Sequence, residues 1–319
     1  MNLKNKIIAV TGGAGFVGSH LVDRLITKKP KRIFIISNFF LGKIENLEEA
    51  QSKFAIEIIS ANVAKAYEIE QVFENDKIDV VFNLSVVPLP TSLLHPVWSF
   101  KENADMTLNL CEIQRSKLFK TLIQFSSSEA YGSTIHSPMK EDHPVNPTTP
   151  YGASKLATDH IVLSYVKTFG IDASVIRPFN IYGPRQNAGQ YAGLIPLTIN
   201  RILNKEELII NGDGLQTRDY TYVTDVADAA INICENESTR GKIINIGSGK
   251  DYSVNAIVET IASLMSYSGK IVHQKGRPGE VSRLIADISL AKELINYSPM
   301  TNFKDGLKKT IEYYKENRG

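Results

Sequence analysis

Two residues with complementary acid–base chemistry stand four positions apart in the segment YGASKLATDH. Tyr151 and Lys155 follow Pro150, which favours the first turn of a helix, and this spacing places both side chains on one helical face. A free tyrosine has a pKa near 10, so lowering it to about 7 requires about 4 kcal/mol of differential stabilisation. An ammonium group about 4 Å away in a partly shielded site supplies about that amount. The pair is therefore a candidate for general acid–base catalysis, although isolated pairs with this spacing are usually helix-surface contacts.

A second group of polar side chains lies in the segment QFSSSEAYGS. It follows an apolar run that predicts a buried strand, so three serines, a carboxylate and a phenol are crowded at the end of that strand. A carboxylate such as Glu129 is costly to bury unless it has a partner or a chemical task. Glu129 is therefore a candidate acid or base, and the alternative is that it accepts hydrogen bonds from nearby backbone amides.

A glycine-rich segment near the N-terminus, IIAVTGGAGFVGSHLVDRL, predicts a dinucleotide site. Gly12, Gly15 and Gly18 stand between a β-branched run and a helical pattern, and Gly13, Gly15 and Gly18 also satisfy G-x-G-x-x-G. Such glycines permit a tight turn and the close approach of a pyrophosphate to the helix N-terminus. A purely structural turn is the alternative, but the strand-loop-helix context favours a bound dinucleotide.

The end of the second apolar run bears on which dinucleotide this is. An acidic residue there usually binds the ribose of NAD, whereas this chain has Ser37 and Asn38 in the segment IISNFFLGK. Neutral residues remove the repulsion toward a 2′-phosphate, and Lys43 lies nearby, so NADP is not excluded. Asn38 can also simply cap the strand end. Because no arginine stands at this position, we expect NAD.

The scaffold that must position these groups reads as an α/β fold. Seven short apolar runs alternate with helical patterns such as GSHLVDRLITKK, AYEIEQVFEND and ADMTLNLCEIQRSK, which is typical of a doubly wound parallel sheet of the Rossmann type. The runs are KIIAV, RIFIIS, AIEIIS, DVVFNLS, TLIQFSS, ASVIRPF and KIINIGSG. Looser segments rich in Gly, Pro and Asn follow and predict a smaller α/β substrate-binding lobe. We assign residues 1–178 and 219–247 to the dinucleotide-binding domain, and residues 179–218 and 248–319 to the lobe.

Composition narrows the class of partner. The 319 residues include 36 basic and 34 acidic side chains, giving a net charge of +2, and no basic block suits nucleic acid or a membrane surface. The apolar runs are too short for a membrane span or a secretory signal. Cys111 and Cys234 lie in apolar segments far apart in sequence, so we expect buried thiols rather than a disulfide or a metal site. We expect a small-molecule partner, no nucleic acid, no membrane, no metal and a cytoplasmic location.

Five motifs in this order resemble the extended short-chain dehydrogenases/reductases that modify nucleotide sugars. They are TGGAGFVG, SSSEAYG, YGASK, RPFNIYGPR and GDGLQTRDYTYVTDVADA, and the resemblance extends from about Lys6 to the C-terminal helix. By this resemblance, Ser127 hydrogen-bonds the reacting sugar oxygen, and Tyr151 and Lys155 form the acid–base pair. The catalytic set is therefore expected to be Ser127, Glu129, Tyr151 and Lys155.

The resemblance also implies ligand contacts and a homodimer. Asn180 and Arg218 would contact the substrate diphosphate and Arg277 would close over it. The alternatives are that the two arginines are solvated surface charges and that Asn180 braces the turn before Gly183. Leu194 and Ile210 lie in YAGLIPLTIN and ELIING, which look like the segments that frame a uracil ring. The cofactor contacts would be Gly12, Gly15, Phe16, Val17, Gly18, Ser37, Asn38, Asn62, Val63, Leu84, Ser85, Asn103, Tyr151, Lys155 and Pro178. The dimer would form through helices near residues 105–116 and 153–169, where the apolar side chains that serve either this contact or the core are Leu156, Ile161, Val162 and Tyr165.

Two segments of the chain depart from the pattern that the family often shows. The segment after the fourth strand is NLSVVPLP, with Asn83 and Ser85, in place of His-x-Ala-Ala. Asn62 and Val63 stand where the family often has Asp-Ile or Asp-Leu near the adenine. These changes leave the fold prediction intact but weaken the transfer of individual cofactor contacts.

Glu129 bears on which reaction of this family to expect. Members begin by removing a hydroxyl proton and a hydride from the sugar to give a 4-keto sugar. A 4-epimerase needs no further carboxylate, whereas a dehydratase must remove the C5 proton and expel the C6 hydroxyl. The resembled dehydratases and decarboxylases carry Glu at this place, many dehydratases as Asp-Glu where this chain has Ser128-Glu129.

We therefore expect an NAD(P)-dependent nucleotide-sugar dehydratase, by 4,6- or 5,6-elimination, acting on a UDP-sugar such as UDP-N-acetylglucosamine. The alternatives are a UDP-sugar 4-epimerase, a reductase or decarboxylase, and a non-catalytic dinucleotide-binding sensor or scaffold.

Overall fold

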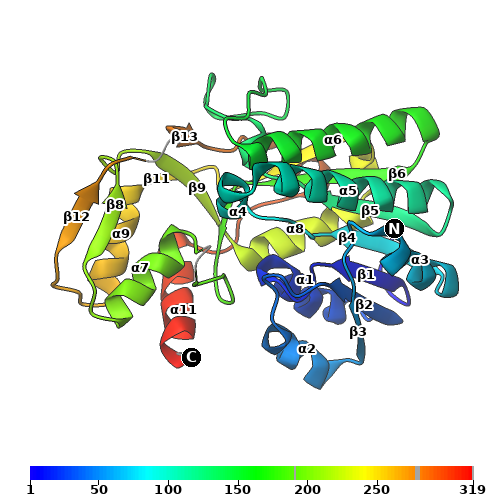
Figure 1. Cartoon of the computed structure of the whole chain (residues 1–319), viewed down its shortest axis with the longest axis horizontal. Helices are drawn as coiled ribbons and strands as arrows, with labels where there is room; N and C mark the ends of the chain where they lie inside the picture. The colour runs from blue at the N-terminus through cyan, green and yellow to red at the C-terminus, as the bar shows by residue number, and fades with distance from the viewer. Residues whose placement is uncertain (190–191, 277–280, 318–319) are drawn as a thin grey trace.

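The computed structural model describes residues 1–189, 192–276 and 281–317. A large sheet with its helices lies at the right of Figure 1, and a smaller lobe lies at the left. The N-terminus belongs to the sheet, whereas the C-terminal helix α11 (Phe303–Glu316) belongs to the lobe.

The large sheet has seven strands, all paired in parallel, in the order β10-β6-β5-β4-β1-β2-β3. The strands are β1 (Ile7–Thr11), β2 (Arg32–Ser37), β3 (Ile56–Ser60), β4 (Ile78–Asn83), β5 (Phe119–Phe125), β6 (Asp172–Pro178) and β10 (Ile243–Ile246). The strand order reverses between β1 and β4, and ligands of open α/β sheets bind at the carboxyl ends of the strands at such a point. The predicted doubly wound Rossmann fold is confirmed.

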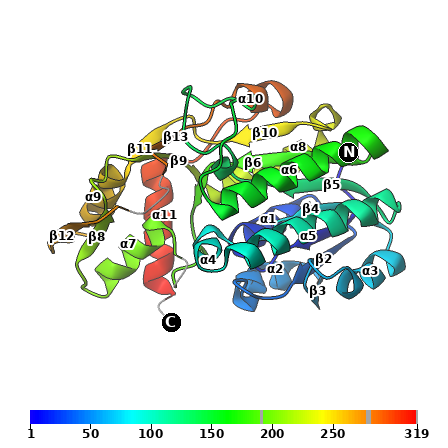
Figure 2. The ribbon, with the colours of Figure 1, turned by 45° about the horizontal axis from the view of Figure 1, so that its top comes forward.

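Helices cover both faces of this sheet because successive strand residues point to opposite sides. Ile8 and Val10 face a core shared with α1, α8 and α10, whereas Ala9 faces a core shared with α3, α5 and α6. The long helices α5 and α6 run side by side (Figure 2). The helices are α1 (Phe16–Thr27), α3 (Ala66–Asn75), α5 (Pro96–Arg115), α6 (Pro150–Phe169), α8 (Val223–Glu235) and α10 (Ser289–Ile295).

The lobe combines a small sheet, a parallel strand pair and three helices around a core rich in tyrosine. Strands β7, β9, β11 and β13 form the sheet, and β8 pairs with β12. The strands are β7 (Asn180–Tyr182), β8 (Leu208–Asn211), β9 (Thr217–Tyr222), β11 (Asp251–Ser253), β12 (Ile271–Gln274) and β13 (Arg283–Leu284). Besides α11, the helices of the lobe are α7 (Leu194–Leu203) and α9 (Val254–Leu264).

Some features differ from the sequence-based expectations. Two short helices, α2 (Glu48–Lys53) and α4 (Leu89–Leu94), were not expected, and α5 begins earlier than its helical pattern suggests. Strand β9 crosses the boundary that we place at residue 218, and α10 packs against the core of the large sheet. The division into domains therefore stays a proposal.

Two further expectations concern thiols and membranes. Cys111 and Cys234 are buried free thiols. None of the helices within the described ranges has the length and apolar character that crossing a bilayer requires.

Candidate active site

The glycine-rich loop between β1 and α1 brings the backbone close to the start of the helix. Gly12 has a φ of +66°, a conformation that favours glycine, and its carbonyl accepts a hydrogen bond of 2.9 Å from the amide of Gly15. A Cβ atom at Gly18 would lie only 2.3 Å from the carbonyl oxygen of Gly12. Because Gly15 precedes α1 and has no side chain to cap it, the first amides of the helix can bind an anion.

A cavity of about 340 Å³ opens at this loop and extends along the carboxyl ends of the strands. All of the predicted cofactor contacts except Asn103 line it. They are Gly12, Gly15, Phe16, Val17, Gly18, Ser37, Asn38, Asn62, Val63, Leu84, Ser85, Tyr151, Lys155 and Pro178. The cavity therefore joins the glycine loop to the candidate acid–base pair, as a dinucleotide site requires.

Asn103 lies beneath the cavity wall and supports it. Its side-chain oxygen accepts from the amide of Val87 at 2.7 Å, and its side-chain nitrogen donates to the Val87 carbonyl and to Ser154 Oγ. Asn103 is 3% exposed, so its polar atoms are used within the protein. Val87 lines the cavity, and a role of Asn103 in cofactor binding would thus be indirect.

The turn after β2 uses the two neutral residues that replace an acid. Ser37 Oγ accepts from the amide of Phe39 at 3.2 Å, and Asn38 Oδ1 accepts from the amide of Phe40 at 3.1 Å. Both side chains thus brace the turn, which fits the simpler interpretation that Asn38 caps the strand end.

Sequence reasoning missed several residues on the cavity wall. Trp98 and Glu102 lie one turn apart on α5, and both line the cavity. The Trp98 ring makes an edge contact with Phe40, with 5.8 Å between ring centroids. The other missed residues are Phe40, Leu41, Gly42, Ala61, Val86, Val87, Pro88, Met106, Phe125, Ser126, Ile181, Arg185, Gln186 and Asn187. The residues after β2 could have been predicted to line the cavity, because the second strand of this fold ends beside the glycine loop. No sequence motif indicates that Trp98 or Glu102 does so.

The start of α6 is fixed against the turn that carries Glu129. Thr149 caps the helix by accepting a hydrogen bond of 3.0 Å from the amide of Gly152. Gly152 packs so closely on the turn that a Cβ atom there would lie 2.5 Å from the carbonyl oxygen of Glu129. The short 3₁₀ helix Ser128–Ala130 and the first turn of α6 therefore hold Ser127, Glu129 and Tyr151 in one place.

Ser127 is oriented toward Tyr151. Its Oγ atom accepts a hydrogen bond of 3.2 Å from the amide of Glu129, which leaves its own proton to donate. Burial raises the pKa of Tyr151, and the hydrogen bond from Ser127 opposes this change. The carboxylates of Glu129 and Asp159 raise the pKa of Tyr151 further.

Lys155 is held beside the same group of residues. Its ammonium donates a hydrogen bond of 2.9 Å to the Phe125 carbonyl and lies 5.9 Å from the centre of the Tyr151 ring. Burial lowers the pKa of Lys155 to about 8, with Asp159 opposing the change. Burial thus disfavours the charged forms of both Tyr151 and Lys155, so the positive charge of Lys155 must act against this effect to lower the pKa of Tyr151.

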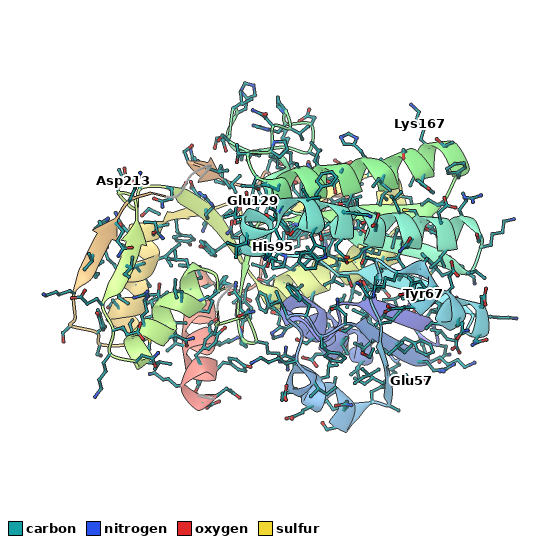
Figure 3. All side chains as sticks on the ribbon, in the orientation of Figure 1. Glu57, Tyr67, His95, Glu129, Lys167 and Asp213 are labelled. Carbon is teal, nitrogen blue, oxygen red and sulfur yellow. The ribbon has the colours of Figure 1, made fainter. Side chains whose placement is uncertain are left out.

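The side chain of Glu129 is partly buried. Among the described residues, no hydrogen bond to its carboxylate oxygens is found, whereas its amide and carbonyl take part in the turn. Burial raises the pKa of Glu129, and the positive charge of Arg218 opposes this shift. Within the described ranges, no backbone amide donates to this carboxylate, so no contact there favours the alternative of a structural acceptor. In Figure 3, Glu129 lies near the boundary between the large sheet and the lobe.

The predicted substrate contacts that the structure describes lie in the lobe, and they differ in how exposed they are. Asn180 begins β7, and Arg218 on β9 is half-buried and close enough to act on Glu129. Leu194 begins α7 and is partly exposed, whereas Ile210 is only 2% exposed and packs in the core of the lobe. Arg277 lies outside the described residues.

The part of the chain that the structure describes contains no candidate metal centre. Groups of three or more His, Cys, Asp or Glu side chains suited to holding a metal ion are absent from it. The described residues of the candidate site offer a tyrosine, a lysine, a serine and a carboxylate in or beside a cavity of about 340 Å³.

Comparison with known proteins gives a consistent picture. The family described as GDP-mannose 4,6 dehydratase matches residues 9–310. A UDP-N-acetyl-alpha-D-glucosaminuronate decarboxylase of Bacillus cytotoxicus is 33% identical, with 96% of this chain and 97% of the relative covered.

Two solved structures share the fold. One is a UDP-glucuronic acid 4-epimerase from Bacillus cereus in complex with UDP-glucuronic acid and NAD, with a TM-score of 0.90, 30% identity, and coverage of 98% of this chain and 100% of the other. The second is a dTDP-glucose 4,6-dehydratase from Bacillus anthracis in complex with NAD, with a TM-score of 0.88, 27% identity, and coverage of 98% and 97%. The same architecture thus serves decarboxylation, epimerisation and dehydration.

Proposed function

Since the chain belongs to the GDP-mannose 4,6-dehydratase family of nucleotide-sugar-modifying enzymes, we propose that it catalyses the NAD-dependent removal of water from a nucleotide sugar. The observation that carries this proposal is the carboxylate of Glu129, which lies partly buried beside Ser127 and Tyr151 and accepts no hydrogen bond from the described residues.

The cavity supports NAD as the cofactor. The amides at the start of α1 would hold the pyrophosphate, and the cavity leads from there to Tyr151 and Lys155. NAD, when bound, accepts a hydride from the sugar and later returns it. Two solved relatives contain NAD, which favours it over NADP.

The first half of the reaction needs a proton acceptor and a group that orients the sugar. We assign proton transfer at the sugar hydroxyl to Tyr151 Oη and orientation of that hydroxyl to Ser127 Oγ. Lys155 supplies a positive charge beside them, held in place by the Phe125 carbonyl. Together these groups yield a 4-keto sugar and a protonated tyrosine.

The second half needs the base that Glu129 provides. The C4 ketone makes the neighbouring C5 hydrogen acidic, so a carboxylate can remove it while the C6 hydroxyl departs as water after receiving a proton. Because the pKa of Glu129 is raised, it lies closer to neutral pH, and a group with such a pKa can both accept and donate a proton during the reaction. The hydride is then returned to C6, with a proton added at C5, in a 4,6-elimination, or to C4, with a proton added at the C4 oxygen, in a 5,6-elimination.

A UDP-sugar such as UDP-N-acetylglucosamine is the proposed substrate. Strands and helices of the lobe carry Asn180, Arg218, Leu194 and Ile210. The positive charge of Arg218, which acts on the Glu129 carboxylate, supports a role in binding the substrate diphosphate. A solved relative at 30% identity contains UDP-glucuronic acid.

A 4-epimerase is the second candidate. The solved UDP-glucuronic acid 4-epimerase of Bacillus cereus, at 30% identity, supports this reaction. An epimerase would use Ser127, Tyr151 and Lys155 in the same way and would not require the carboxylate of Glu129.

Product analysis distinguishes these reactions. Purified protein is incubated with NAD and a panel of UDP-, GDP-, dTDP- and CDP-sugars, including uronic acids, and the products are analysed by mass spectrometry and NMR. A dehydratase gives a product lighter by one water, and a decarboxylase gives one lighter by carbon dioxide. An epimerase gives a product of unchanged mass with inverted C4. Either of the last two results would overturn the proposed dehydration.

We also propose a homodimer formed through α5 and α6 and a cytoplasmic location. Val97 and Phe100 at the start of α5 are 82% and 39% exposed, and Phe169 at the end of α6 is 54% exposed. Val162, one of the side chains considered for the contact, is fully buried in the core of the sheet domain. The buried thiols fit a reducing compartment.

A further inference from the structure

Asn62 and Glu102 come from distant parts of the chain and meet on the wall of the cavity. Asn62 follows β3, and Glu102 lies on α5 one turn after Trp98. Asn62 Nδ2 donates a hydrogen bond of 3.2 Å to Glu102 Oε2, and both residues line the cavity. Among the described residues, Glu102 accepts no other hydrogen bond, so its second carboxylate oxygen can bind a ligand.

The orientation of the Asn62 side chain is fixed by its neighbours. Asn62 Oδ1 accepts from the amide of Ala64 at 3.0 Å, and the Asn62 amide donates to Glu68 Oε2 at 2.7 Å. A reversed side chain would place its NH₂ group against the Ala64 amide, a donor against a donor. The NH₂ group of Asn62 therefore points toward Glu102.

This arrangement differs from that of an aspartate at the same position. An aspartate has a second oxygen that can accept a hydrogen bond from an amino group, whereas Asn62 presents a donor there. The nearest acceptor is then the carboxylate of Glu102. Side by side, the Asn62 NH₂ and the Glu102 carboxylate form a donor next to an acceptor.

The edge of an adenine ring has the complementary pattern, because its amino group donates and the adjacent ring nitrogen accepts. We propose that Glu102 accepts a hydrogen bond from the adenine amino group and, with Asn62, makes the site selective for an adenine dinucleotide. This inference rests on the proposed binding of NAD, and it adds a specificity-determining residue on α5. A hypoxanthine ring, which has an oxygen in place of the amino group, would face the Glu102 carboxylate with a second acceptor.

The test compares binding of NAD with binding of nicotinamide hypoxanthine dinucleotide. Trp98 is the only tryptophan of the chain and lines the same cavity, so its fluorescence reports binding of either compound without turnover. The wild-type protein should bind NAD about tenfold more tightly, as expected for one lost hydrogen bond to a charged group. Glu102→Ala should reduce this preference to about twofold or less.

Two further variants separate recognition from general damage. Glu70→Ala removes an exposed glutamate of α3 that does not line the cavity, and it should keep the wild-type preference. Adding Asn62→Asp to Glu102→Ala should restore the preference, because the aspartate again offers an acceptor to the amino group. A purely structural role of Glu102 would not predict this rescue.

The possible failures are distinguishable. Equal wild-type affinities for the two dinucleotides, or a preference unchanged by Glu102→Ala, would overturn the role of Glu102 while leaving NAD binding intact. Absence of NAD binding to the wild-type protein would instead overturn the proposed function, and this inference with it.

Discussion

The carboxylate of Asp159 and the guanidinium of Arg177 form an ion pair of 2.5 Å whose side chains are 0% and 1% exposed. Asp159 lies one turn after Lys155 on α6, and its Oδ2 atom also accepts a hydrogen bond of 2.8 Å from Ser126 Oγ. Ser126 directly precedes Ser127. One carboxylate thus ties the helix of the acid–base pair to the end of β5 and to β6.

Removing one partner of this pair should destabilise the fold. Asp159→Asn keeps the shape but leaves a buried guanidinium without its counter-charge, which typically costs about 3–5 kcal/mol of unfolding free energy. The exposed pair Arg24–Asp228 provides the control, because Asp228→Asn should cost at most about 1 kcal/mol. Urea denaturation of the three proteins measures both effects. A similar decrease in unfolding free energy for the two variants would show that the buried pair stabilises the fold no more than the exposed pair does.

The tyrosine assignment predicts a separation of chemistry from binding. Tyr151→Phe removes the proton acceptor and hardly changes shape, so turnover should fall by about 10²-fold or more while NAD affinity changes little. Steady-state rates and the fluorescence of Trp98 measure the two quantities independently. A rate loss below about tenfold would contradict the assignment of Tyr151 as the acid–base group.

The pKa of Lys155 predicts a decline of activity in alkaline solution. Burial lowers this pKa to about 8, and a lysine is charged only below its pKa, so the ammonium is lost as pH rises through about 8. The value of kcat/KM, which reports the free enzyme, should therefore decrease above about pH 8. Lys155→Arg keeps the positive charge and should move the decline to higher pH, even if its maximal rate is lower. A profile that is flat from pH 7 to pH 10 would be inconsistent with this role.

If the protein is a dimer, its molar mass in solution should equal that of two chains and should not change with protein concentration. Light scattering at micromolar concentration should give this value, because α5 and α6 run side by side (Figure 2) and carry the exposed apolar side chains Val97, Phe100 and Phe169. Val97→Glu places a charge at an 82% exposed position and should shift the protein toward the monomer without unfolding it. A wild-type monomer would refute the dimer.

The sequence predicted the large sheet well because parallel strands buried on both faces appear as continuous apolar runs. The glycine loop was equally clear, since Gly12 and Gly18 are required by close backbone contacts that other residues would disrupt. The Asn62–Glu102 contact could not be found in the same way, because partly buried polar residues on a helix follow no periodic pattern. Asn103 shows a second reason why sequence prediction falls short. A motif can indicate that a residue lies near the site, but it does not indicate which atoms its side chain hydrogen-bonds.

The role of Glu129 is tested by Glu129→Gln, which keeps the volume of the side chain and removes the base. In a dehydratase, oxidation at C4 should survive because Ser127, Tyr151 and Lys155 perform it, whereas removal of the C5 proton should fail. The variant should then accumulate reduced nicotinamide, visible in the near ultraviolet, and lose exchange of the C5 hydrogen with deuterated water.

Two comparisons decide how this result is interpreted. Ser128→Ala removes a hydroxyl that is 3% exposed and tests whether Ser128 assists proton delivery to the departing hydroxyl. If Glu129 alone both takes and gives the proton, Ser128→Ala should keep turnover within about tenfold, which is less than the typical cost of losing an acid–base group. In a 4-epimerase, Glu129→Gln would also stay within about tenfold, because no step of epimerisation needs a carboxylate there. Wild-type protein that interconverts C4 epimers without losing water or exchanging the C5 hydrogen would rule out the role of Glu129 as a base, because in a dehydratase the C5 proton must leave before water can.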